Sequence, residues 1–206
     1  SDLSSKERFL MTTATTRRTT RLTQLSLLVA LLAVLGFTPL GFIMIPPVSI
    51  TLMHIPVIIG AILLGPLDGA ILGGVFGCIS LFKAVTTPGG PVDLLFSPAA
   101  SGAPVSSLIM CLAPRILLGV IAALVYKAAQ RAGMRPELCI GAAAAIAAVS
   151  HTVMVLGCLW IFFQAIALKE VFLTIISVNG LCELAAAIIL SVFVCRPVQI
   201  FLKARR

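Results

Sequence analysis

The most constraining stretch of this sequence is residues 49–82, where two apolar arms are joined by a turn at residues 65–69. Each arm holds about 16 residues without a fixed charge, close to the shortest helix that crosses a bilayer. The second arm places Gly69, Gly73 and Gly77 four residues apart, so they share one helix face. In lipid, such a face allows another helix backbone to approach closely. The stretch therefore predicts a membrane-spanning helical hairpin with a flat contact surface.

The rest of the chain fits the same class of protein. Hydrophobic residues make up 60% of the 206 residues and charged residues 11%, against about 45–50% and about 25% in soluble domains. We therefore predict an all-α membrane protein of six transmembrane helices. They are expected at about 22–38, 49–65, 68–84, 105–126, 138–163 and 171–195. Residues 1–21 are predicted to be a flexible polar tail, and residues 22–203 one six-helix domain.

The basic residues predict the orientation of the chain in the membrane. Twelve of the fifteen lysines and arginines flank the spans on the side of the N-terminus, whereas Lys83 and Lys169 flank the other side and Arg115 lies within a span. Because cytoplasmic loops are enriched in these residues, both termini are predicted to be cytoplasmic. Two proline-rich segments, 38–48 and 85–103, then lie together on the outer side. We interpret the second as a partly inserted lid, with a mobile surface loop as the alternative.

Several classes of protein are poorly supported. The net charge of +8 does not indicate nucleic acid, because the basic residues sit at span ends, where anionic headgroups explain them. The six cysteines lie in or beside apolar segments without C-x-x-C spacing, so no metal site is predicted. No nucleotide-binding loop, H-E-x-x-H or G-x-S-x-G motif occurs. We therefore expect no catalytic residues, no cofactor and no ATP hydrolysis by this chain.

Polar side chains inside the predicted spans are the candidate binding residues. A charge at bilayer depth costs about 2.5–3.5 kcal/mol by insertion scales, so it is expected to face the protein interior and to have a partner. The candidates are Arg115, His151, Asn179, Glu183 and His54. One interpretation pairs Arg115 with Glu183 as a structural ion pair. The other assigns Arg115, alone or with His151 and Asn179, to an anionic or polar solute, because arginine holds a carboxylate through two parallel hydrogen bonds.

Three further residues or groups have structural interpretations. Ser26, Ala30 and Ala33 form a small-residue stripe on the first span, which suits contact with a helix of this chain or of a partner. Trp160 is expected to be an anchor at the outer interface. Asp68 is expected to cap the N-terminus of a helix.

Four motifs carry a family resemblance. They are FTPLG at 37–41, HIPVIIGA at 54–61, LGP at 64–66 and GAILG at 69–73. Together they resemble the substrate-binding (S) components of energy-coupling factor (ECF) vitamin transporters. Later motifs, APR at 113–115, TVMVLG at 152–157 and Asn179 with Glu183, are similar to the pantothenate type. The resemblance covers about residues 22–200.

The resemblance implies a multi-pass protein of a prokaryotic cell membrane with an outward-facing vitamin site covered by loops. It also implies a complex with a transmembrane coupling subunit and two ATPase subunits that use ATP, in which the S component topples to carry its ligand inward. The sliding contact would be supplied by Ser26, Ala30, Ala33, Gly69, Gly73 and Gly77. His151 stands where the family pattern leads us to expect asparagine, so the substrate or its recognition can differ.

Other functions remain as alternatives at this stage. Another vitamin, such as riboflavin, folate or thiamine, would fit the same family. A stand-alone secondary transporter or channel would take up solute alone, although no internal repeat with two interrupted helices occurs. An intramembrane enzyme or a purely structural subunit has less support from the motifs.

Overall fold

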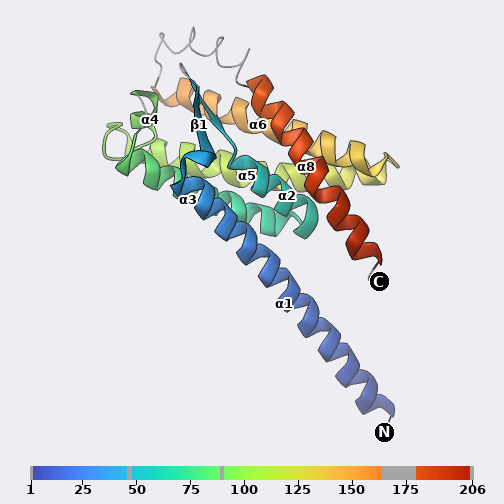
Figure 1. Ribbon diagram of the computed structural model, residues 1–206. Helices are drawn as coiled ribbons and strands as arrows, with labels where there is room; N and C mark the ends of the chain where they lie inside the picture. The colour runs from blue at the N-terminus through green and yellow to red at the C-terminus, as the bar shows by residue number, and fades with distance from the viewer. Residues whose placement is uncertain (1, 46–47, 89–90, 164–179, 205–206) are drawn as a thin grey trace.

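The computed structural model describes residues 2–45, 48–88, 91–163 and 180–204. Helices dominate this part of the chain (Figure 1). The long helices are α1 (Asp2–Phe37), α3 (Pro66–Thr86), α5 (Pro104–Arg131), α6 (Pro136–Phe163) and α8 (Gly180–Ala204), and the short ones are α2 (His54–Leu64) and α4 (Pro91–Leu95). Five of these helices contain stretches long and apolar enough to cross a membrane. The prediction of a mainly helical fold is thereby confirmed, and these helices have the length and composition of membrane spans.

The second predicted span, 49–65, is wrong in its first part. Residues 49–51 instead belong to strand β2 (Val48–Thr51), which forms an antiparallel hairpin with β1 (Phe42–Ile45). Strand β1 and the short 3-10 helix η1 (Pro39–Gly41) lie in the segment predicted as a proline-rich loop. Helix α2 has 11 residues, or about 16 Å at 1.5 Å per residue, too short for a hydrocarbon core of about 30 Å. The β-branched residues of β2 favour a strand, and a short apolar run does not distinguish strand from helix by periodicity.

The ends of the chain also differ from expectation. Helix α1 begins at Asp2, so residues predicted to form a flexible tail are helical, and this part of α1 extends away from the other helices (Figure 1). Helix α8 runs to Ala204, beyond the predicted end of the sixth span. The beginning of that span, including Asn179, lies outside the described residues.

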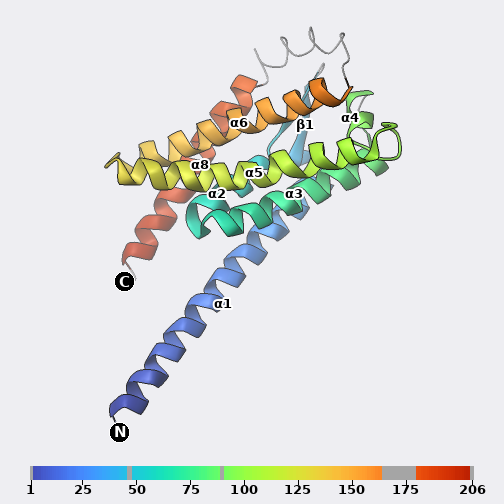
Figure 2. The same cartoon turned by 180° about the vertical axis from the view of Figure 1, so that it is seen from behind.

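Helices α3, α5 and α6 lie in sequence across one side of the molecule, with α5 between the other two (Figure 2). The glycines of α3 permit this packing. A Cβ atom at Gly69 would lie 2.8 Å from the carbonyl oxygen of Gly119, and one at Gly77 would lie 2.8 Å from that of Cys111. At Gly73 it would collide with the carbonyl oxygen of Arg115. The flat surface read from the sequence is therefore occupied by α5 of the same chain.

An ion pair fixes α1 against the start of α3. Arg21 donates from Nε and Nη2 to the two carboxylate oxygens of Asp68, at 2.6 and 2.7 Å. Asp68 is almost fully buried, with 1% of its surface exposed. The predicted role of Asp68 as an N-cap is wrong: the capping residue is Gly65, whose φ of 108° suits glycine. Asp68 lies inside the first turn, where a carboxylate is also favoured by the helix dipole.

Candidate functional site

A cavity of about 240 Å³ lies where the first residue of α2 meets the middle of α6 and the start of α8. Three of the residues singled out in the sequence line it: His54, His151 and Glu183. The remaining lining is mostly aliphatic and includes Ala148, Val149, Val153, Leu156, Leu181 and Leu184. A mostly apolar cavity with a few convergent polar groups is the usual form of a small-molecule site.

Glu183 and His54 connect this cavity to the β-hairpin. The carboxylate of Glu183 accepts a hydrogen bond from the backbone N–H of Thr51 at 2.6 Å, which ties the end of β2 to α8. His54, three residues after Thr51, is 97% buried, and its Nε2 has no hydrogen-bond partner within the described chain. The contact of Glu183 with Thr51 and the direct connection of β2 to α2 therefore hold the hairpin at the edge of the cavity.

Arg115 is positioned by the proline that precedes it. In an α-helix the carbonyl of residue 110 accepts from the N–H of residue 114, but Pro114 has no N–H to donate. The Met110 carbonyl oxygen is taken instead by Nη1 of Arg115, at 2.6 Å. In lipid, a carbonyl freed by proline is re-satisfied by neighbouring groups. Here the freed carbonyl binds the guanidinium and fixes it beside α5.

Two aromatic rings enclose the Arg115 guanidinium. Its central carbon lies 5.5 Å from the ring centroid of Phe76 on α3 and 5.4 Å from that of Phe96, within the range of cation–π attraction. The Phe76 ring also lies 6.0 Å, centroid to centroid, from the His151 ring. Arg115 does not line the cavity itself, and Phe76 is the side chain that lies between it and His151.

The interpretation of Arg115 as the partner of Glu183 is not supported. Glu183 bonds the Thr51 backbone, and Arg115 bonds the Met110 carbonyl. The salt bridges formed by the described residues are those of Arg21 with Asp68 and of Arg196 with Glu137. The Nε of Arg115 is buried without a hydrogen-bond partner in this part of the chain. The Nε edge of the Arg115 guanidinium is thus not used in a structural ion pair.

The segment predicted as a lid lies against α5 beside Arg115. The hydroxyl of Ser107 donates to the carbonyl of Leu95 at 2.7 Å, and Cys111 Sγ lies 3.5 Å from the carbonyl oxygen of Phe96. These contacts hold the Phe96 ring over the guanidinium. The described part of this segment therefore covers one side of Arg115.

The predicted partner-contact residues fall into two groups. On α1, Ser26 and Ala30 are exposed and Ala33 is partly exposed, beside exposed leucines at 27 and 31. On α3, the glycines at 69, 73 and 77 are buried against α5. The α1 stripe is thus open to a partner, whereas the glycine face is closed by this chain's own packing. Trp160, the expected interface anchor, is 67% exposed.

Sequence reasoning missed three residues that shape the surroundings of Arg115: Phe76, Phe96 and Pro114. A proline directly before a buried arginine is a readable signal, because it leaves an unpaired carbonyl one turn away. The two phenylalanines gave no such signal, since apolar aromatics are ordinary in a membrane span. Among the described residues, no group of three or more His, Cys, Asp or Glu side chains is placed to hold a metal ion.

Comparison with known proteins agrees with this architecture. Residues 20–195 match the family described as "ECF transporter, substrate-specific component", and the chain belongs to that family. It is therefore a multi-pass transport protein of the cell membrane and not an enzyme. The family resemblance seen in the sequence motifs is confirmed.

Two relatives are informative. The chain is 38% identical over 156 residues to the pantothenic acid transporter PanT of Lactococcus lactis subsp. cremoris, covering 70% of this chain and 75% of the relative. It is 36% identical over 92 residues to the pantothenate transporter PanT of Leuconostoc mesenteroides subsp. mesenteroides, covering 45% of this chain and 40% of that relative.

Proposed function

We propose that this chain binds pantothenate at the outer side of the membrane and delivers it for uptake as the S component of an ECF importer. The family supplies the transport role, and the names of two relatives supply the vitamin. The coupling subunit and two ATPase subunits of the ECF complex are the proposed partners. ATP is used by those subunits, and this chain needs no cofactor of its own.

One observation carries the assignment of the site. Three buried nitrogens have no hydrogen-bond partner in the described chain: Arg115 Nε, His54 Nε2 and His151 Nε2. More than about 90% of buried polar groups in folded proteins are paired, so these nitrogens favour a polar ligand. Pantothenate has one carboxylate, two hydroxyls and an amide. Its carboxylate matches the unpaired Nε edge of Arg115, and its neutral groups match the two imidazoles, which donate or accept as required.

The proposed site lies toward the outside, because the excess of basic residues at the opposite ends of the spans favours cytoplasmic termini. In this orientation the β-hairpin and α2 together occupy the place of the predicted second span, and α8 belongs to the sixth. The exposed stripe of Ser26, Ala30 and Ala33 is the proposed contact with the coupling subunit. The buried glycines of α3 are not included in it.

Titration calorimetry on the purified protein tests the ligand and the role of Arg115. Two charge-assisted hydrogen bonds contribute about 1.5–3 kcal/mol each, so Arg115→Ala is expected to weaken pantothenate binding by more than about 100-fold. Arg131→Ala removes an exposed arginine from the end of the same helix and should bind like the parent. Size-exclusion profiles confirm that both variants are folded. Unchanged affinity of the Arg115 variant would refute the assignment.

The same calorimetry, repeated with riboflavin, folate and thiamine, tests the vitamin. Tighter binding of any of these than of pantothenate would overturn the substrate while leaving the family intact. Liposome uptake tests the partnership: pantothenate should accumulate only when the ECF coupling and ATPase subunits are present with ATP. Uptake by this chain alone, driven by an ion gradient, would contradict an S-component role.

A further inference from the structure

A second cavity, of about 470 Å³, lies at the end of the molecule where the chain turns from α5 into α6. It is formed where the end of α2, the α5–α6 turn and the end of α8 meet. Its polar lining comes from Tyr126, Gln130 and Gln199, and its apolar lining includes Ile62, Leu63 and Leu202. Unlike the first cavity, it plays no part in the proposed vitamin site.

Three of its polar side chains form a connected hydrogen-bonded group. Nε2 of Gln130 and Nε2 of Gln199 both donate to the Tyr126 hydroxyl oxygen, at 2.9 and 2.8 Å. That oxygen has two lone pairs, so both are used and the hydroxyl is left as a donor. Each amide group also has a second N–H. The group therefore offers several donors to one space, which is the pattern that suits an oxygen-rich anion.

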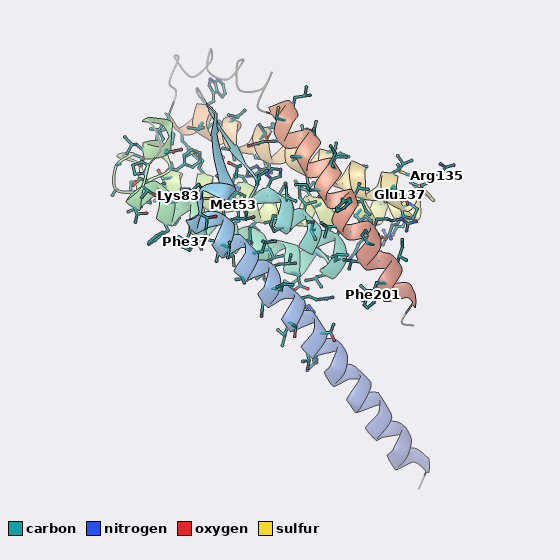
Figure 3. The ribbon with its side chains drawn as sticks, viewed as in Figure 1. Phe37, Met53, Lys83, Arg135, Glu137 and Phe201 are labelled. Atoms are coloured by element: carbon teal, nitrogen blue, oxygen red, sulfur yellow. The ribbon has the colours of Figure 1, made fainter. Side chains whose placement is uncertain are left out.

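The charge around the cavity has the same sign. Within residues 126–139 and 196–202, Lys127, Arg131, Arg135 and Arg196 provide four positive charges, and Glu137 provides one negative charge. Glu137 is engaged by Arg196. In Figure 3, Arg135 and Glu137 lie at the end of the molecule opposite Lys83. An anion approaching this end meets a net positive surface.

The length of the helices around the cavity indicates that it lies at the level of the lipid headgroups. Helices α5 and α6 have 28 residues each, or about 42 Å at 1.5 Å per residue. A hydrocarbon core is about 30 Å thick, so the turn between the two helices extends into the headgroup layer. The donors of Tyr126, Gln130 and Gln199 lie at this end, next to aliphatic side chains that continue along the spans.

We propose that this cavity binds the phosphodiester headgroup of an anionic phospholipid. The Tyr126 hydroxyl and the glutamine amides donate to the phosphate oxygens, the arginines of the turn supply attraction, and Ile62, Leu63 and Leu202 contact the first carbons of the acyl chains. A bound lipid would contact α2, α5, α6 and α8 at once and leave the α1 stripe open. This proposal is independent of which vitamin the chain carries.

Native mass spectrometry and thermal melting of the full chain test the proposal, with phosphatidylglycerol, phosphatidylcholine and inorganic phosphate as probes. The parent should retain phosphatidylglycerol in preference to phosphatidylcholine and gain melting temperature with it. Tyr126→Phe removes the hydroxyl donor, and Gln199→Leu removes an amide. Each should lower the retained phosphatidylglycerol at least about tenfold, the lower limit for losing one hydrogen bond to a charged group.

Gln24→Leu, at a partly buried glutamine on α1, is the matched control and should retain lipid like the parent. The use of two variants keeps the test decisive if one of them does not fold. Equal retention of the two lipids by the parent would overturn the proposal, as would full retention by both cavity variants. Stabilisation by inorganic phosphate equal to that by phosphatidylglycerol would show a site for free anions and would also overturn it.

Discussion

Replacing Pro114 with alanine tests whether the orientation of the Arg115 side chain matters for binding, because the arginine itself is kept. Alanine restores the backbone N–H that Pro114 lacks, and this N–H competes for the Met110 carbonyl that now accepts from Arg115 Nη1 at 2.6 Å. A hydrogen bond to a charged group contributes about 1.5–3 kcal/mol. If that contribution orients the guanidinium for its ligand, Pro114→Ala should weaken pantothenate binding by about 10- to 150-fold.

Stability should change in the opposite direction. Proline inside a helix costs about 3 kcal/mol in water because it removes a hydrogen bond and clashes with the preceding turn. Its replacement should therefore raise the melting temperature of the purified protein while affinity falls. A variant that is more stable and binds less tightly is hard to explain by general damage, so the two measurements together isolate the effect on Arg115.

Pro197→Ala is the matched control, because Pro197 also lies inside a helix, α8, but far from Arg115 in the sequence and without an arginine after it. It should raise the melting temperature and leave affinity unchanged. Calorimetry and thermal melting of the two variants are compared with the parent under one condition. Parent-like affinity of Pro114→Ala, or an equal loss of affinity in Pro197→Ala, would refute the reasoning.

Two further substitutions test the packing around the site. Gly73→Ala would place a methyl group against the carbonyl oxygen of Arg115 and should destabilise the protein by about 1–3 kcal/mol; Gly74→Ala, whose nearest neighbour would be 4.0 Å away, should melt at or above the parent temperature. Equal melting of the two variants would contradict the close contact of α3 with α5. Glu183→Leu removes the acceptor of the Thr51 N–H, so hydrogen exchange should speed up in the β-hairpin; unchanged exchange there would show that this bond does not hold the hairpin.

The candidate residues were found in the sequence for a thermodynamic reason. Burying a charge or an imidazole in a membrane span is costly, so Arg115, His54, His151 and Glu183 stood out against their apolar surroundings. The positions of these residues relative to one another could not be predicted in the same way. The structure places His54, His151 and Glu183 around one cavity and Arg115 beside it, with Phe76 between.

The interactions of Glu183 show the limit most clearly. A lone arginine and a lone glutamate in neighbouring spans predict a salt bridge by charge alone. The structure instead joins Glu183 to the backbone N–H of Thr51 in β2, a residue that hydropathy had assigned to a helix. Because the hairpin itself was not foreseen, its N–H groups were not considered as partners for the carboxylate.

The sequence by itself determined that this chain lies in a membrane, where helices α3, α5 and α6 fall to within a few residues, and which family it belongs to. Each of these depends on local properties: the free energy of transferring an apolar segment into lipid, the interruption of helices by glycine and proline, and short sequence motifs. Only the tertiary structure decided that residues 48–51 pair as a strand, that the α3 glycines pack on α5 rather than face outward, and that the Met110 carbonyl, left without a donor by Pro114, accepts from Arg115. These outcomes depend on contacts between residues that are far apart in the sequence. A buried polar group forms a hydrogen bond with whichever group the fold places next to it, and a glycine face packs against whichever helix lies beside it.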